Sequence, residues 1–85
     1  MPQPRLTLLG KPGCHLCDDA RQVVLEVAAE RGLPLEELNI LDDEKLLADY
    51  AEEIPVLLID DRVHQIWRID PARLRRALDE RGAGA

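Results

Sequence analysis

The order of the apolar segments along this chain constrains its fold more than any other feature of the sequence. Residues 5–9 are short, apolar and flanked by proline and glycine, which is the pattern of a buried strand. After a loop at residues 10–13, apolar residues recur at three- and four-residue steps from Leu16 to Ala28, as on one face of an amphipathic helix. This helix is predicted to run from about Cys14 or His15 to Arg31. A second strand pattern follows at residues 35–41. Strand, helix and strand in this order predict a parallel pair joined by a right-handed crossover.

The second half of the chain predicts another helix and a hairpin. Asp42 or Asp43 can cap a short helix over residues 44–51, in which Leu46, Leu47 and Tyr50 face inward. Residues 56–59 are apolar throughout, which is typical of a strand in the centre of a sheet. Residues 63–67 then form its hairpin partner across a tight turn.

The last helix has clear boundaries in the sequence. Asp70 is a suitable N-cap, Pro71 suits the first helical position, and Gly82 ends the pattern. Residues 82–85 are expected to fray. We therefore predict a single domain over residues 1–85 of the α/β class, in the order β-α-β-α-β-β-α. It consists of a mixed four-stranded sheet with helices on both faces.

Composition excludes several classes of function. A formal net charge of −6 argues against a general nucleic-acid binder, which needs basic residues to displace phosphate counterions. The longest strictly aliphatic run, residues 56–59, is far too short to span a membrane, and the N-terminus lacks the apolar stretch of a signal peptide. We expect a cytoplasmic monomer without membrane association. In that reducing compartment, a close cysteine pair is more often catalytic or metal-binding than a permanent cross-link.

The charges are unevenly distributed along the chain. Residues 36–61 contain ten acids and one base, whereas residues 62–81 contain six arginines and three acids. Two interpretations stay open. The charges can simply be solvated faces of helices, or they can form a polarised surface that steers the docking of a charged protein partner.

Cys14 and Cys17 are the only cysteines, and Cys14 falls where the first loop becomes the first helix. The partial positive charge at a helix N-terminus stabilises a thiolate and lowers its pKa, which makes Cys14 a candidate nucleophile. Cys17 lies one turn further on the same side of the helix and is more interior. It can therefore attack a mixed disulfide formed by Cys14.

Three uses of this cysteine pair fit the residues alone. A redox-active dithiol is favoured by the strand–loop–helix context. A zinc site would need about four ligands, and His15 and His64 are the only imidazoles in the sequence. Two unreactive thiols on a core face are the third possibility.

Three segments resemble the motifs of the glutaredoxins, within the thioredoxin-fold superfamily. Residues 11–17, Lys-Pro-Gly-Cys-His-Leu-Cys, resemble the active-site motif with its lysine three residues before C-x-x-C. Residues 53–56, Glu-Ile-Pro-Val, resemble the cis-proline segment, and Asp70 resembles the aspartate near the start of the last helix. The resemblance spans nearly the whole chain and implies a thioredoxin/glutaredoxin-like fold. It also implies a thiol–disulfide oxidoreductase in which Cys14 attacks and Cys17 resolves.

The resemblance implies further site residues. The Ile54–Pro55 peptide bond would be cis and face the cysteines, and Ile54 would offer its N–H and C=O to an extended substrate. Lys11, Ile54, Pro55 and Asp70 would then bind substrate. From the residues alone, Pro55 can equally be a trans residue that stops a helix, Lys11 a solvated loop residue and Asp70 a helix cap.

One departure from the family concerns glutathione. Trp67 and Arg68 stand where glutathione-dependent members have a Gly-Gly pair, and glycine is used where a ligand must approach the backbone. We expect no bound cofactor. The bulk of Trp67 would hinder glutathione as a reductant, and a flavoprotein of the thioredoxin-reductase type is the other electron source. The nearer resemblance is to small bacterial glutaredoxin-like proteins without Gly-Gly.

The expected partners are a disulfide-containing protein or small molecule and the external reductant. Two alternatives to the oxidoreductase remain. One is a redox-inactive binding module of the thioredoxin fold, which uses the Pro55 segment and the polarised surface to hold a partner. The other is a redoxin that supplies electrons to an enzyme such as ribonucleotide reductase.

Overall fold

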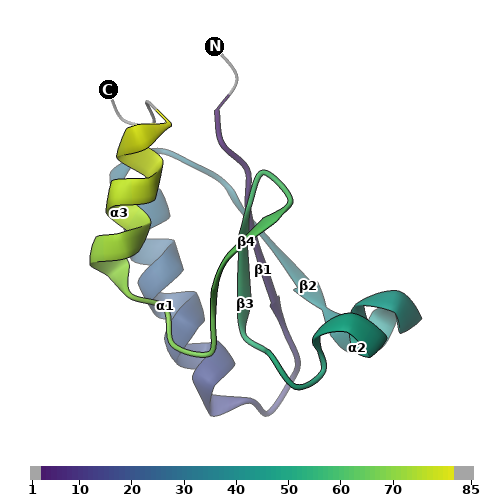
Figure 1. The fold of residues 1–85 in the computed structure, drawn as a ribbon. Helices are drawn as coiled ribbons and strands as arrows, with labels where there is room; N and C mark the ends of the chain where they lie inside the picture. Colours follow the sequence, from purple (N-terminus) through teal and green to yellow (C-terminus); the bar gives the residue numbers. More distant parts are fainter. Residues whose placement is uncertain (1–2, 82–85) are drawn as a thin grey trace.

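The chain folds into a mixed four-stranded sheet with helices on both faces (Figure 1). The computed structural model describes residues 3–81, so the fraying expected at residues 82–85 lies outside the described part. The elements are β1 (Leu6–Gly10), α1 (His15–Glu30), β2 (Leu35–Asn39), a 3-10 helix η1 (Ile40–Asp42), α2 (Glu44–Tyr50), β3 (Val56–Ile59), β4 (Arg62–Ile66) and α3 (Pro71–Glu80). The predicted order of strands and helices is confirmed.

The strands lie side by side in the order β2-β1-β3-β4. β1 pairs with β2 in parallel, as the strand–helix–strand pattern predicts, with Leu6 opposite Leu35. β3 is antiparallel to β1 and forms a hairpin with β4. β1 and β3 are therefore the central strands, and the predicted central place of the apolar segment Val56–Ile59 is confirmed.

Two hydrophobic clusters fill the two faces of this sheet. Alternate residues of a strand point to opposite faces. Leu6 and Leu8 of β1 join α1 and α3 in what we call the large core, whereas Leu9 belongs to what we call the small core. Figure 1 shows α1 and α3 together on one side of the sheet and α2 on the other. The members of the small core are Leu9, Cys17, Ile40, Ile54 and Val56, and partly buried residues that include Leu46 and Tyr50 of α2 pack against them.

Three details of the sequence prediction are wrong. β2 ends at Asn39 rather than Leu41, because the Asn39 side chain accepts a hydrogen bond of 2.9 Å from the Leu41 N–H and starts the 3-10 helix. β4 ends at Ile66, because Trp67 has a φ of +64°, which is incompatible with a strand. Leu47 does not face inward but is 39% exposed, since the short α2 turns only Leu46 and Tyr50 toward the sheet.

The connections that carry the candidate site residues meet at one end of the sheet. β1 and β4 finish at this end, and the antiparallel β3 begins there. The loop before α1, the segment before β3 and the connection from β4 to α3 are therefore neighbours (Figure 1). We call this the disulfide end.

Candidate functional site

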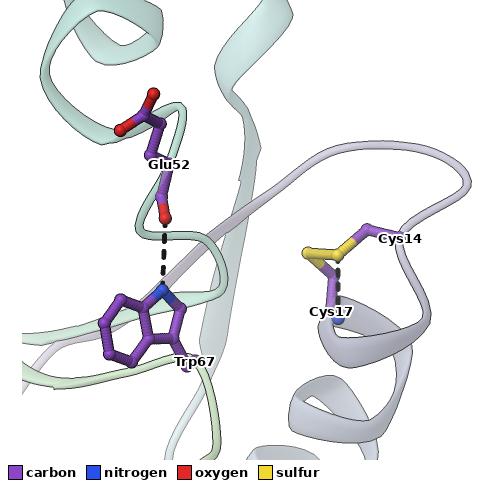
Figure 2. The surroundings of a disulfide bond; sticks show 4 residues. All are labelled: Cys14, Cys17, Glu52 and Trp67. Atoms are coloured by element: carbon purple, nitrogen blue, oxygen red, sulfur yellow. Dashed lines mark hydrogen bonds between the residues drawn. A yellow bond between two sulfur atoms is a disulfide. The ribbon is translucent and has the colours of Figure 1, made fainter.

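The cysteine pair lies where the loop after β1 becomes α1. Cys14 is the N-cap of α1 and has extended backbone angles, φ −97° and ψ 113°. Its Sγ accepts a hydrogen bond of 3.2 Å from the Cys17 N–H, one of the amides that a helix N-terminus leaves without an intrahelical partner. The two residues form a disulfide, with their Cα atoms 5.2 Å apart (Figure 2). In the dithiol form, the same N–H and helix terminus would stabilise a thiolate at Cys14.

The two cysteines differ in their access to solvent. Cys17 is 7% exposed and is a member of the small core. Cys14 is partly buried and packs against the edge of that core. The more accessible sulfur at the helix terminus is thus placed to meet an external disulfide, and the interior sulfur can reach only its neighbour.

Gly10 makes room for the interior cysteine. A Cβ atom on Gly10 would lie 3.1 Å from the Cys17 Sγ and 3.2 Å from the Cys17 Cβ. Both distances are shorter than ordinary van der Waals contact, so a glycine at this place lets Cys17 pack against the end of β1. The sequence pattern predicts Gly10 as part of the loop and does not predict this role. A glycine at the end of a buried strand is the signal that could have indicated a close approach.

The proline segment lies against the cysteines. The Ile54–Pro55 peptide bond is cis, as the family resemblance predicts. Ile54 is 8% exposed and shares the small core with Cys17. Among the described residues, neither the N–H nor the C=O of Ile54 has a backbone hydrogen-bond partner. These two groups can therefore pair with the backbone of an incoming strand.

Trp67 forms the side of the site opposite the cysteines, as Figure 2 shows. Its backbone N–H donates to the Pro55 C=O at 2.8 Å, and its Nε1 donates to the Glu52 C=O at 3.2 Å. Trp67 is 53% exposed. Its left-handed backbone is a conformation that glycine favours. The chain thus combines a glycine-like backbone with a large aromatic side chain, at the position of the family's Gly-Gly pair.

Asp70 caps α3. One carboxylate oxygen accepts from the Ala72 N–H at 2.9 Å and from the Arg73 N–H at 3.5 Å. The predicted N-cap is therefore confirmed, while a role of Asp70 in substrate binding stays a prediction.

Gln65 holds the backbone of this cap in place, a contact that the sequence pattern did not predict. Its side chain is 5% exposed; Oε1 accepts from the Asp70 N–H at 2.8 Å, and Nε2 donates to the Asp70 C=O at 3.1 Å. The buried amide thus links β4 to the residue before α3, and so joins the two ends of the connection that carries Trp67. A glutamine within a strand pattern gave no signal of this role, because its partner is set by the tertiary structure.

Lys11 lies on the other flank of the cysteines. It is exposed, and with Pro12 and Cys17 it lines a groove of about 320 Å³ that extends to Leu38 and Asn39 of β2. Within residues 3–81, Lys11 has no ion pair. Its amine is thus available to an anionic group, but its predicted role in substrate binding remains a prediction.

The histidines do not extend the site into a metal centre. No group of three or more His, Cys, Asp or Glu side chains in the described part of the chain could hold a metal ion. His64 lies on β4, where partial burial, followed by the charges of Arg73 and Arg81, lowers its pKa below the usual 6.5.

Of the helices that the structure describes, none is long and apolar enough to cross a membrane.

Comparisons with known proteins agree with this geometry. The family described as a glutaredoxin-like domain matches residues 5–79. The solution structure of protein Ne2328 from Nitrosomonas europaea is similar, with a TM-score of 0.78 and 25% identity over 92% of this chain and 94% of that one. The crystal structure of protein XcR50 from X. campestris has a TM-score of 0.68 and 34% identity, over 88% and 96% of the two chains.

A more distant similarity shows the fold alone. A mutant thioredoxin from Halobacterium salinarum has a TM-score of 0.69 at 16% identity, over 92% of this chain and 74% of that one. The predicted thioredoxin-like fold is thereby confirmed. The names of the proteins from N. europaea and X. campestris state no activity.

Proposed function

The chain belongs to the glutaredoxin-like domain family, and on that premise we propose that it is a thiol–disulfide oxidoreductase that acts by dithiol exchange. One observation carries the proposal above all others. The only two cysteines form a disulfide at the N-terminus of a helix, with the accessible Cys14 at the N-cap and the buried Cys17 one turn later. A redox-type function is what this fold and motif support together.

In the proposed cycle, the Cys14 thiolate attacks one sulfur of a substrate disulfide. A mixed disulfide forms, and the other substrate sulfur leaves as a thiolate and takes up a proton. Cys17 then loses its proton and attacks the Cys14 Sγ, which expels the second substrate sulfur. The substrate gains two electrons and two protons, and the protein ends with the Cys14–Cys17 disulfide. The Cys17 N–H that points at the Cys14 Sγ supports Cys14 as the attacking group, because it would stabilise the thiolate.

The substrate would bind along the proline segment. The unpaired N–H and C=O of Ile54 can add one extended strand of substrate, and the buried Pro55 fixes that segment beside the cysteines. We assign Lys11 a charge contact with an anionic part of the substrate or reductant. Asp70 would contribute mainly by holding the start of α3.

An external reductant must restore the dithiol. We propose a protein reductase, such as a flavoprotein, rather than glutathione. The exposed indole of Trp67, followed by Arg68, occupies the position where glutathione-dependent members have Gly-Gly. Glycine at that position lets a tripeptide approach the backbone, and a large side chain restricts the approach.

The test is reduction of a disulfide whose released thiolate absorbs visible light, by the wild type, Cys14→Ser and Cys17→Ser. We expect Cys14→Ser to be inactive. Cys17→Ser should form the mixed disulfide once, release one thiolate per protein and then stop, which mass spectrometry would show. His15→Ser, an exposed change between the two cysteines, serves as a control that keeps turnover. Full activity of Cys14→Ser would show that the mechanism is wrong.

A further inference from the structure

A groove of about 240 Å³, lined by apolar side chains together with Asp19 and Arg68, lies beside the disulfide, between α1 and the connection from β4 to α3. Leu16, Ala20 and Val23 of α1 form one side, and Trp67 and Ile69 form the other. Leu16 is 40% exposed and Trp67 is 53% exposed, so two large apolar side chains at this groove are left in contact with water. Single exposed apolar residues are common, but a pair that flanks a groove next to reactive sulfurs suggests a surface that a partner covers.

The charges at the disulfide end indicate what kind of partner this is. Four acids lie near the start of α1 and on the segment before β3, namely Asp18, Asp19, Glu52 and Glu53. Among the described residues, none of these acids has an ion-pair partner. Lys11 and Arg68 are the bases on the neighbouring connections, so the balance is negative.

The ion pairs of the described residues join α1, α3, the β2 strand, the β3–β4 turn and the chain before β1, and none of them involves these four acids. Acids elsewhere in the described range, such as Glu26, Glu36 and Glu80, have no ion pair either. The four acids are therefore distinguished by their place beside the groove. Unpaired charges around a groove attract partners of opposite charge and increase their association rate.

We propose that this groove binds an extended, positively charged segment of a protein disulfide substrate, with a bulky apolar side chain of that segment between Leu16 and Trp67. The inference rests on the proposed function and adds the substrate class. The free Ile54 N–H and C=O would pair with the backbone of the segment, the groove would take its apolar side chain, and the acids would face its basic residues. Glutathione, which carries two carboxylates and one ammonium group, has the wrong sign of net charge for this surface.

The experiment uses matched synthetic peptide disulfides as probes. Two peptides carry a leucine beside the cysteine and differ only in flanking residues, arginine in one and glutamate in the other. A third has arginine flanks and an alanine in place of the leucine. We expect kcat/KM for the arginine–leucine peptide to exceed that for the glutamate peptide by about tenfold or more at low salt. The advantage should shrink as the ionic strength rises, and the alanine peptide should have a higher KM than its leucine counterpart.

Variants of the protein assign the effect to this surface. Asp19→Asn combined with Glu52→Gln should reduce the preference for arginine flanks, and the Glu52 change leaves the backbone C=O that accepts from Trp67 intact. Leu16→Ala should remove the difference between the leucine and alanine peptides. Glu80→Gln is the control, because it removes one carboxylate charge, as each of the two substitutions does, at an exposed site at the far end of α3. It should leave both preferences unchanged.

The outcomes separate this inference from the proposed function. If the wild type reduces none of the peptides, the proposed oxidoreductase activity is wrong. If it reduces all three at equal rates at every ionic strength, the activity stands and the docking inference is overturned. A faster reaction with the glutamate peptide, or an equal effect of Glu80→Gln and the double variant, would also overturn it.

Discussion

The two faces of the sheet differ in what they do for the molecule. On the face covered by α1 and α3, the large core contains completely buried aliphatic side chains such as Val24, Leu74 and Leu78. The opposite face holds the small core, to which α2 contributes no fully buried residue and in which one of the reactive cysteines takes part. Stability and redox chemistry are thus supported largely by different clusters. Substitutions in the two cores should therefore differ in kind and not only in size.

The largest effect is expected from Leu74→Ala in the large core. Leu74 is 0% exposed, so its truncation leaves a cavity and should lower the free energy of unfolding by about 2–5 kcal/mol. Urea unfolding would measure the loss. The matched change Leu47→Ala removes the same atoms from a side chain that is 39% exposed and should cost far less. Disulfide reduction per folded molecule should be unchanged in both, and a loss of activity at full folding would break the separation of the two cores.

The second prediction concerns Gly10→Ala in the small core. β1 is paired on both sides, so the added methyl would displace the Cys17 sulfur, 3.1 Å away, rather than the strand. We expect a stability loss of about 1–3 kcal/mol from overpacking. The dithiol can relieve this contact by rotating the sulfur and the disulfide cannot, so the reduction potential should rise by about 20–60 mV. Equilibration with thiol–disulfide buffers would measure it.

Gly32→Ala is the matched control for this prediction. Gly32 has a φ of +65°, so alanine is strained there, but no atom lies within 4 Å of the added Cβ. This variant should lose stability while its reduction potential stays unchanged. If Gly10→Ala also leaves the potential unchanged, Gly10 supports the fold only, and the proposed link between the small core and the redox balance is wrong.

The sequence predicted those parts of the fold that depend on neighbours along the chain. Apolar periodicity located α1, and the apolar run at Val56–Ile59 indicated a central strand. The cap at Asp70 followed from one residue type before a proline. The cysteine pair at the start of α1 was predictable for the same reason, because loop, spacing and helix are contiguous.

Contacts between distant segments were not predictable in this way. The approach of Gly10 to Cys17 and the hydrogen bond from Trp67 to the Glu52 C=O depend on how the strands are arranged. The Gln65 side chain hydrogen-bonds to the Asp70 backbone only because β4 places it beside that residue. The cis bond before Pro55 came from the family resemblance, since most X–Pro bonds in folded proteins are trans.

A smaller effect is expected from Asp70→Ala, where the large core reaches the disulfide end. The substitution removes the carboxylate that accepts from the Ala72 and Arg73 N–H groups and should cost about 1 kcal/mol. Chemical denaturation would measure this loss. Asp70→Asn can still cap the helix and should keep nearly full stability. If Asp70→Asn is stable but its KM for disulfide substrates rises, the carboxylate binds substrate in addition to capping the helix. The start of α3 would then belong to the substrate site as well as to the fold.

The smallest effect is expected from His64→Gln and depends on pH. His64 lies at the bulge of β4, and its Nε2 lies 3.0 Å from the Gln65 Nε2, which can donate to it only while the imidazole is neutral. Partial burial, with the charges of Arg73 and Arg81, lowers the folded pKa of His64 below 6.5. As the pH falls through about 6.5, the unfolded chain therefore takes up this proton before the folded protein does, and stability falls until the pH is below the folded pKa.

His64→Gln removes this contribution. Urea unfolding at pH 7.5 and pH 5.0 should therefore show a smaller decrease in the free energy of unfolding than in the wild type. His15→Gln removes the other, exposed histidine as a control. Parallel pH profiles for the wild type and His64→Gln would show that protonation of His64 does not affect the stability of the fold.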